Sequence, residues 1–370
     1  MQKLNVLLLA LLLIGCSHAD PLDVSRLKLP EGFHITIFSQ APGARFMTFT
    51  PGGVLLVSDT NDGTVLALPD PQHSGKASRT VTVLQELNAP HGLAFHNGKL
   101  YVAETDKVSS YDWNEAQLRA SNPRLITNLP RGGAHFTRTI LFANGKLYVS
   151  VGSDCNICVE KDERRAAVLE MNDDGSGQHI FARGLRNAVG LAFNSRTGTV
   201  WAGDNGRDWL GDNLPPEEVN DLGKNGGDFG WPYCYGDRHP NPEFRAAGEK
   251  RCPSTIPPKV EMQAHGAPLG IAFYSGSLFP KEYDGDLFVA LHGSWNRSAL
   301  SGFKVVHIKI GPNGEPQGGA EDFITGWVKP GEKKDGPRMG RPVAVLPGPD
   351  GALYVSDDTA NVVYRVTYGK

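Results

Sequence analysis

The 370-residue sequence has few of the patterns that build long helices or bind nucleic acid. Long stretches with a helical period are scarce, whereas glycine (44) and proline (26) are abundant between short Val, Leu, Tyr and Phe runs. Short apolar runs separated by glycine and proline are typical of an all-β protein. The formal net charge of -3 argues against nucleic acid as the main partner. Because 40% of the residues are hydrophobic, the chain can still bury a large core.

The apolar run near the N-terminus, from Val6 to Ile14, is too short to span a bilayer as a helix. It follows Lys3 and predicts a signal peptide over residues 1–15. The ending LLIGC resembles the bacterial lipobox, in which the cysteine is lipidated; an ordinary cleaved signal is the alternative. We expect an exported lipoprotein on the periplasmic face of a bacterial membrane, the outer membrane, with a lipid on Cys16 as its membrane contact.

Cysteine is also scarce, and four cysteines follow the lipobox: Cys155, Cys158, Cys234 and Cys252. An even number in an exported chain predicts two disulfides. A haem c motif is excluded because Val159 stands where histidine is required. A zinc site would need a second CxxC, and a redox CxxC would need a βαβ setting. We therefore expect structural disulfides at 155/158 and 234/252.

A strand–turn–strand unit recurs six times along the chain. Its copies occupy residues 43–59, 89–104, 134–154, 186–204, 267–292 and 340–358. Their apolar anchors, spaced by 46, 47, 51, 80 and 73 residues, are Phe49, Phe95, Phe142, Phe193, Phe273 and Leu346. The short spacings fit one four-stranded propeller blade each, and the two longer ones imply insertions. We predict a six-bladed β-propeller over residues 29–370, after a linker over 16–28; a β-sandwich would not repeat one unit six times.

Histidine or arginine precedes the anchor of every copy by four to eight positions. These residues are Arg45, His91, His135 with Arg138, Arg186 with Asn187, His265, and Arg341. Since the innermost strand of each blade starts at one face of the channel, we expect these side chains at one rim. Arginine suits carboxylates or phosphates, and histidine titrates near neutrality. Each alone fits an exposed loop, but six in register predict an anionic ligand and proton transfer.

The insertion over residues 202–234 carries acidic and amide side chains among glycines. Oxygen donors in an irregular loop suit Ca²⁺, although the spacing is not that of an EF-hand. From the residues alone, a calcium loop and a polar surface loop are equal alternatives.

Four motifs together resemble the soluble pyrroloquinoline quinone (PQQ) sugar dehydrogenases, closest to the aldose sugar and sorbosone dehydrogenase-like members. They are HFTR (135–138), GLRN (184–187), EEVN (217–220) and GGDFGWP (226–232). The resemblance runs from about Leu29 to Tyr368. It implies a six-bladed propeller with PQQ over the channel mouth and hydride transfer from C1 of a small-molecule sugar to the quinone. It also implies a separate electron acceptor, because the sequence contains no cytochrome motif.

The resemblance assigns roles to residues. His135 matches the general base, and Arg186 matches the arginine that stabilises charge on the reducible carbonyl. We expect cofactor contacts from His91, Arg138, Asn187, Arg297, Arg338 and Arg341. We expect substrate contact from His265 and calcium ligation by main-chain carbonyls near Asn205 and Gly206.

Two departures from the family pattern bear on the calcium site and on the choice of sugar. Gly206-Arg207 stands where the family has Gly-Pro, which puts the calcium geometry in question. No aromatic platform is evident around His265, which favours another aldose or aldehyde-bearing sugar over glucose. A calcium-dependent lactonase-type propeller and a non-catalytic secreted binding propeller are the alternatives. The lactonase would require several carboxylates or asparagines around the channel.

Overall fold

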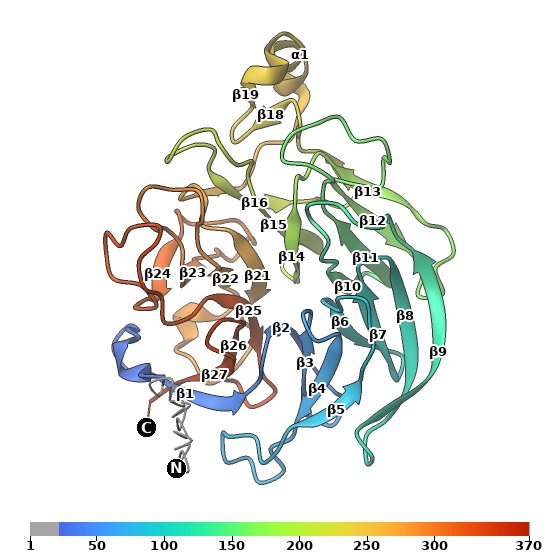
Figure 1. The fold of residues 1–370 in the computed structure, drawn as a ribbon, viewed down its shortest axis with the longest axis vertical. Helices are drawn as coiled ribbons and strands as arrows, with labels where there is room; N and C mark the ends of the chain where they lie inside the picture. Colours follow the sequence, from blue (N-terminus) through green and yellow to red (C-terminus); the bar gives the residue numbers. More distant parts are fainter. Residues whose placement is uncertain (1–21, 370) are drawn as a thin grey trace, which may run out of the picture.

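The computed structural model describes residues 22–369, which form six blades around a central channel (Figure 1). The predicted all-β, six-bladed propeller is confirmed. The predicted signal peptide, Cys16 and the first part of the linker lie outside the described residues and stay predictions. None of the helices in the described part is long and apolar enough to cross a bilayer.

Each blade contains four antiparallel strands, and the first strand of each copy lies next to the channel. Blade 1 contains β2 (Ala44–Phe49), β3 (Leu55–Asp59), β4 (Thr64–Leu68) and β5 (Val81–Leu84). Blade 2 contains β6 (Leu93–His96), β7 (Lys99–Glu104), β8 (Lys107–Asn114) and β9 (Arg119–Asn128). Blade 3 contains β10 (Ile140–Ala143), β11 (Lys146–Val151), β12 (Ala167–Met171) and β13 (His179–Arg183).

The other three blades follow the same plan. Blade 4 contains β14 (Ala188–Asn194), β15 (Thr199–Asp204), β16 (Glu217–Asp221) and β20 (Val260–Met262). Blade 5 contains β21 (Pro268–Phe273), β22 (Leu287–Leu291), β23 (Lys304–Ile308) and β24 (Glu321–Ile324). Blade 6 contains β25 (Pro342–Pro347), β26 (Leu353–Asp357), β27 (Val362–Tyr368) and, as its outer strand, β1 (Phe33–Gln40).

Strand β1 closes the ring. It pairs with β27 in antiparallel register from Phe33 opposite Tyr368 to Gln40 opposite Val362, so the first and last strands of the fold share one blade. The ring of Phe33 makes edge contacts, at centroid distances of 4.8 to 5.2 Å, with Phe279, Tyr283, Phe323 and Tyr368. The closing strand is therefore held by packing as well as by its backbone ladder.

The hydrophobic core is divided among the interfaces between blades. Six clusters of buried side chains each join two neighbouring blades. Strands such as β3, β22 and β26 are buried at every position because both of their faces pack against other blades. This packing explains the short, continuous apolar runs in the sequence and fixes the inner strands that carry the rim residues.

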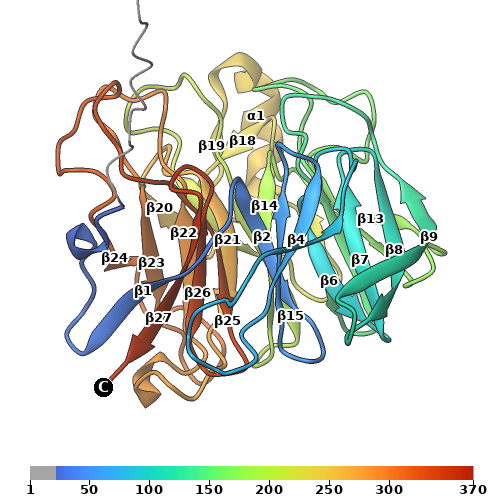
Figure 2. The same cartoon turned by 60° about the horizontal axis from the view of Figure 1, so that its bottom comes forward.

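Two insertions account for the two long anchor spacings. The first, between β16 and β20, contains β17 (Gly227–Asp228), β18 (Cys234–Tyr235), β19 (His239–Pro240), the 3₁₀ turns η2 (Pro242–Phe244) and η3 (Cys252–Ser254), and helix α1 (Arg245–Arg251). The second consists of the loops after β22 and β24. Figure 2 shows the first insertion (yellow) and these orange-red loops rising from the same face. Two further 3₁₀ turns are η1 (Val24–Arg26) and η4 (Lys281–Tyr283).

The aromatic cluster around Phe33 generates a stability prediction. We expect Phe33→Ala to lower the free energy of unfolding by about 3–5 kcal/mol, because it leaves a cavity where the ring closes. His34→Ala is the matched control, since His34 is exposed on the same strand, and should change stability little. Urea denaturation of both variants checks this, and equal stabilities would contradict a closing role for Phe33.

Candidate functional site

Several predicted site residues converge on one cavity at the start of the inner strands, which we call the rim cavity. It has a volume of about 160 Å³. Its lining residues are His135, Arg186, Asn187, Asn205, Gly206, Asp208, Glu217, His265, Ala267, Gly293, Trp295 and Asn296. The predicted catalytic pair, the predicted substrate residue and the two predicted calcium ligands are thus neighbours, brought together by blades 3, 4 and 5.

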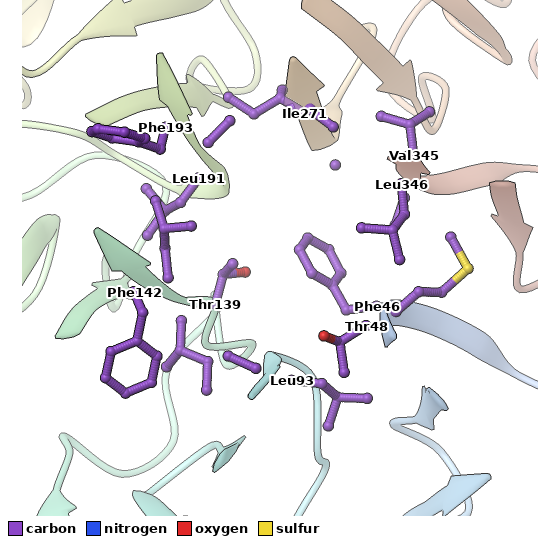
Figure 3. Close-up of a pocket in the computed structure, with 18 of the residues that line it drawn as sticks. Phe46, Thr48, Leu93, Thr139, Phe142, Leu191, Phe193, Ile271, Val345 and Leu346 are labelled. Carbon is purple, nitrogen blue, oxygen red and sulfur yellow. The ribbon is translucent and has the colours of Figure 1, made fainter. Parts of the chain in front are cut away.

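The channel itself contains a larger cavity, of about 350 Å³, further along the inner strands (Figure 3). Its lining side chains are almost all apolar, with Thr48 and Thr139 as the polar exceptions. No ionisable side chain lines it, so it offers no group for acid–base chemistry. Of these two cavities, the smaller rim cavity is the one that contains ionisable side chains.

Arg186 is the most constrained side chain of the rim cavity. Its Nε and Nη2 donate to the carbonyl and the side-chain oxygen of Asn156, each at 3.0 Å. Nη2 also donates to Asp208 Oδ2 at 2.9 Å, and Nη1 donates to the carbonyls of Asn205 and Gly206 at 3.2 and 2.8 Å. All five N–H donors are used within the protein. Burial lowers the pKa of Arg186, but an arginine stays protonated at neutral pH.

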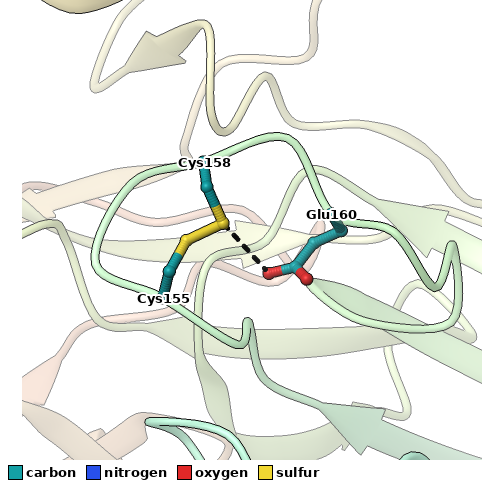
Figure 4. Close-up of side chains that lie close together, drawn as sticks. All are labelled: Cys155, Cys158 and Glu160. Carbon is teal, nitrogen blue, oxygen red and sulfur yellow. Dashed lines mark hydrogen bonds between the residues drawn. A yellow bond between two sulfur atoms is a disulfide. The ribbon is translucent and has the colours of Figure 1, made fainter.

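Asn156 holds this arginine from inside a four-residue disulfide loop. The predicted Cys155–Cys158 bridge is confirmed, with Cα atoms 6.2 Å apart (Figure 4). The Asn156 side chain also accepts from the backbone N–H of Asp208 at 2.7 Å and donates to its carbonyl at 3.1 Å. Glu160 lies beside the bridge, but two sulfurs joined to each other leave no thiolate for a metal. The bridge therefore has a structural role in shaping the loop around Arg186.

His135 is held so that one ring nitrogen faces the rim cavity. Its Nδ1 lies 3.0 Å from the carbonyl oxygen and 2.9 Å from the hydroxyl of Ser153. Because a carbonyl only accepts, Nδ1 carries the proton and Nε2 is the acceptor. Among residues 22–369, Nε2 has no hydrogen-bond partner. Burial, aided by the charge of Arg186, lowers the pKa of His135 to about 3, so the imidazole is neutral at ordinary pH.

Glycine at position 152 allows His135 and Asn187 to lie side by side. A Cβ there would come within 2.6 Å of both Asn187 Oδ1 and His135 Cβ. The Asn187 side-chain amide, like His135 Nε2, has no partner in the described part of the chain. His135 Nε2 and the Asn187 amide thus both lie at the rim cavity and are available to hydrogen-bond a ligand.

Two buried carboxyls hold the backbone behind the rim cavity. Asp204 accepts from the backbone N–H groups of Arg186 and Asn187 at 3.0 and 2.6 Å. Glu217 accepts from Gly206 and Ala267 at 2.7 and 2.9 Å. Burial raises the pKa of each to about 7. They fix the loops that carry Arg186 and the carbonyls of Asn205 and Gly206.

The structure does not bring His91 or Arg138 into the rim cavity. His91 is fully buried in the channel wall, with its ring centre 4.1 Å from that of Phe46 and tilted by 38°, and its Nε2 has no partner among the described residues. Burial and then the charge of Arg45 lower its pKa. Arg138 is also fully buried and donates to the carbonyls of Pro130, His135 and Thr137 at 2.8 to 2.9 Å. Its observed role is to hold the segment that carries His135.

Other predicted cationic residues surround the rim cavity without lining it. Arg341 donates to the carbonyls of His292 and Gly293 at 3.1 and 2.8 Å, and its guanidinium lies 5.5 Å from the ring centre of Phe303. Arg338 lies over the same ring, at 5.7 Å, and is exposed. Arg45 pairs with Asp358 at 2.6 Å. Arg45 is thus paired with a carboxylate, and Arg341 is bonded to backbone carbonyls.

Arg297 lies in a second cavity, of about 410 Å³, that shares Trp295 and Asn296 with the rim cavity. Sequence patterns do not predict Asn156, Asp208 or the exposed Trp209 at the site. The CNIC segment indicates a disulfide, the insertion over residues 202–234 indicates calcium ligation, and HGSWNR indicates only Arg297.

Comparisons with known proteins find one family and several relatives that match nearly the whole described chain. A family model described as TrAA12-like matches residues 27–369. An uncharacterized protein of Borreliella burgdorferi is 32% identical, over 94% of this chain and 92% of its own length. A pyrroloquinoline quinone-dependent pyranose dehydrogenase of Coprinopsis cinerea is 25% identical over 95% of this chain. This chain spans 56% of that enzyme's length.

A solved structure has the same architecture. It is described as the holo form of the pyranose dehydrogenase PQQ domain from Coprinopsis cinerea, with a TM-score of 0.80 and 25% identity. The match covers 92% of this chain and 97% of that one. The rim cavity therefore lies in a propeller whose relatives include a PQQ-containing domain.

The disulfide loop generates a prediction about Arg186. We expect Cys155→Ser with Cys158→Ser to speed solvent exchange of the Arg186 Nε–H at least about tenfold, since Asn156 would lose its fixed position. The stability loss should be only about 2 kcal/mol because the loop is short. Exchange is measured by NMR on the folded protein.

The matched control is the second confirmed bridge, Cys234–Cys252, which spans 18 residues and does not line the rim cavity. Replacing both of its cysteines by serine should cost more stability, about 3 kcal/mol, because it closes a longer loop. It should leave the Arg186 exchange rate unchanged. Equal exchange rates in the two double variants would show that the 155/158 bridge does not position Arg186.

Proposed function

The chain belongs to the TrAA12-like family, and from this premise we propose that it is a PQQ-dependent sugar dehydrogenase. The proposed reaction oxidises C1 of an aldose or a related aldehyde-bearing sugar by hydride transfer to the quinone. One observation carries the proposal: His135, which is neutral, presents to the cavity an acceptor nitrogen with no partner among residues 22–369, and the same cavity contains a fixed guanidinium.

The residues around the rim cavity fit a flat anionic quinone. Asn187 offers an unpaired amide among the described residues, and Trp295 offers an exposed aromatic face. Arg297, Arg338 and Arg341 lie on the side of the second insertion, where they would hold carboxylates. When bound, PQQ supplies the electrophile that accepts the hydride.

The same residues do not form an open calcium site. The carbonyls of Asn205 and Gly206 both accept from Arg186, so a cation already occupies the point where they converge. Arg207, which replaces the proline of the family pattern, pairs with Glu243 and ties this loop to the first insertion. The predicted calcium ligation stays a prediction, and no step below depends on calcium.

His135 is the proposed base. Its Nε2 accepts the proton of the sugar C1 hydroxyl while Ser153 keeps the ring in the required tautomer. Anionic groups bound near His135 would raise its proton affinity from the low value set by burial. Arg186, fixed by Asn156 and Asp208, presents a preorganised positive charge to oxygen that becomes negative in the transition state. His265 also lines the rim cavity, and a bond at 2.8 Å between its Nε2 and the Gly211 carbonyl fixes its ring.

The sugar, the electron acceptor and the location are further parts of the proposal. A separate acceptor must reoxidise the cofactor, since the chain has no second redox motif. An exported, lipid-anchored protein on the periplasmic face of the outer membrane agrees with the LLIGC signal. A lactonase would use carboxylates of the cavity, but Asp208 and Glu217 are engaged by Arg186 and by backbone N–H groups.

Reconstitution tests the activity directly. We expect purified protein to oxidise at least one aldose with a dye acceptor after PQQ is added, and to show no such activity without PQQ. A panel of aldoses and sugar aldehydes is assayed with and without added Ca²⁺, alongside a lactone substrate. Lactone hydrolysis without PQQ-dependent sugar oxidation would replace the proposal by the lactonase alternative.

Replacement of the base generates a second prediction. We expect His135→Gln to retain PQQ affinity and to lose a factor of about 10²–10⁴ in kcat, because glutamine cannot take the proton. His179→Gln, at an exposed position on β13, is the matched control. A His135→Gln rate within about threefold of wild type would contradict general base catalysis at this residue.

The pH profile adds a test of the same residue. A base works when it is unprotonated, so activity is lost as the pH falls through the pKa of His135. Burial lowers that pKa from 6.5 to about 3 in the protein without cofactor, and bound anionic groups would raise it from that low value. We therefore expect an acidic limb of kcat that lies below pH 6.5 and disappears in His135→Gln. A His135-dependent limb at or above pH 6.5 would contradict the effect of burial on this base.

A further inference from the structure

The apolar cavity inside the channel, which we call the channel cavity, takes no part in the chemistry of the rim cavity. Its volume of about 350 Å³ lies in the usual range for ligand pockets. It opens at the far ends of the inner strands, where five large side chains of its lining are half-exposed: Phe95, Phe142, Phe193, Phe273 and Leu346. Apolar side chains that remain exposed around an opening indicate a site for an apolar ligand.

A layer of apolar side chains, which we call the septum, separates the channel cavity from the rim cavity. It consists of Val189, Leu269 and Val343, which are buried and pack together, and of Phe46, which packs against them. These residues come from β14, β21, β25 and β2, so four blades contribute to closing the channel at this level. Packed side chains leave no passage for a sugar or for a cofactor.

The order of residues along an inner strand gives the thickness of the septum. On β14, Asn187 lines the rim cavity, Val189 belongs to the septum and Leu191 lines the channel cavity. On β21, Leu269 and Ile271 repeat the last two steps. Four residues of strand span at most about 13 Å. The septum is therefore one side-chain layer thick, which stops molecules but lets electrons cross.

The channel cavity offers two hydroxyls to a ligand, from Thr48 on β2 and from Thr139 directly before β10. Figure 3 shows both oxygens turned toward the open middle of the cavity. In the part of the chain that the structure describes, the Thr48 hydroxyl has no hydrogen-bond partner. The Thr139 hydroxyl makes only a long contact, 3.4 Å, with His91 Nδ1. Both hydroxyls are thus available as donors between apolar walls.

A quinone has the distribution of groups that this lining fits. Its ring is flat and apolar, and a para-quinone carries two carbonyl oxygens on opposite edges that accept hydrogen bonds. A sugar would leave most of its hydroxyls unpaired against apolar walls, and an anion would find no cationic side chain in the lining. The proposed sugar oxidation also leaves the cofactor reduced, and the chain has no second redox motif that could reoxidise it.

We propose that the channel cavity binds a small apolar para-quinone as the electron acceptor. This inference rests on the proposed function and names the acceptor class. Two electrons per sugar cross the septum, and the bound quinone takes them with two protons from water at the open mouth of the channel and becomes a quinol. The two protons released when the cofactor is reoxidised leave by the rim cavity. Sugar and acceptor thus occupy opposite sides of the septum and do not compete.

Binding to the protein without PQQ tests the site before any turnover. Isothermal titration uses menadione, a methylated naphthoquinone, as the probe, and we expect saturable binding. Thr48→Phe should raise its Kd at least about tenfold by filling the cavity. Thr48→Val should raise it about fivefold by removing one donor. Thr36→Phe and Thr36→Val, at an exposed position on β1, are the matched controls and should bind normally.

Two results would overturn the site: no saturable binding of menadione, or equal affinities in wild type and Thr48→Phe. The thermal midpoints of the variants are measured alongside, because a phenylalanine in the channel wall can disturb folding. Thr48→Val keeps nearly the same side-chain shape and decides the matter if Thr48→Phe does not fold. An affinity of Thr48→Val equal to that of wild type would also overturn the proposal.

Kinetics of the PQQ-loaded protein separate this inference from the proposed function. With menadione as acceptor, Thr48→Phe should lower kcat/KM for the acceptor at least about tenfold. Ferricyanide, a hydrophilic anion that apolar walls exclude, should be reduced at the wild-type rate. An unchanged menadione rate, or competition between menadione and the sugar, would overturn the channel route and leave the sugar dehydrogenase intact. Menadione binding by a protein that oxidises no sugar with any acceptor would overturn the proposed function and leave a quinone site without an acceptor role.

Discussion

The guanidinium of Arg186 is surrounded by oxygen atoms that accept all five of its N–H groups. Such a fork keeps its geometry only while every acceptor stays in place, and these acceptors come from separate loops. Asn156 lies in the disulfide loop, and Asp208 lies in the loop after β15. The same loops carry Ser153, which contacts His135, and Trp209, which lines the second cavity, so one buried cation sets the relative positions of the base, the charge and this second cavity.

The propeller makes this arrangement possible because it brings the starts of six inner strands to one rim. Blade interfaces provide the stability, so the loops at the rim are free to vary in length and chemistry. Here blades 4 and 5 carry the insertions, and the site lies on that side of the axis. Buried Asp204 joins the end of β15 to the backbone before β14, and buried Glu217 joins the loop after β15 to the backbone before β21.

Much of this could be predicted from the sequence. The six copies were visible because inner strands keep a fixed order of apolar anchor and turn, and the resemblance to the soluble PQQ sugar dehydrogenases is confirmed at the level of family. His135, Arg186, Asn187 and His265 could be aligned by register alone. Register does not give burial, however, so His91 and Arg138 were expected in the cavity although both point into the wall.

The remaining features depend on contacts between insertions, which have no period. Trp209 and Trp295 are 86 residues apart in the sequence numbering, and bonds between their two loops, such as those from Asn296 to Asp208 and from Ser298 to Asp212, bring them together. The carbonyls of Asn205 and Gly206, predicted as calcium ligands, both accept from Arg186, and this pairing could not be inferred from a loop sequence. The path of β1 back to β27 likewise follows from tertiary packing around Phe33.

The proposed function requires hydride transfer from sugar C1 to PQQ bound at the rim cavity, with His135 as the base. Mixing PQQ-loaded protein with an active sugar, without air or acceptor, and following the absorbance of the cofactor measures this step. We expect one reduction per loaded protein molecule, slowed severalfold when C1 carries deuterium. A cofactor that stays oxidised, or a reduction rate that is the same for the deuterated sugar under conditions where chemistry limits the rate, would contradict it.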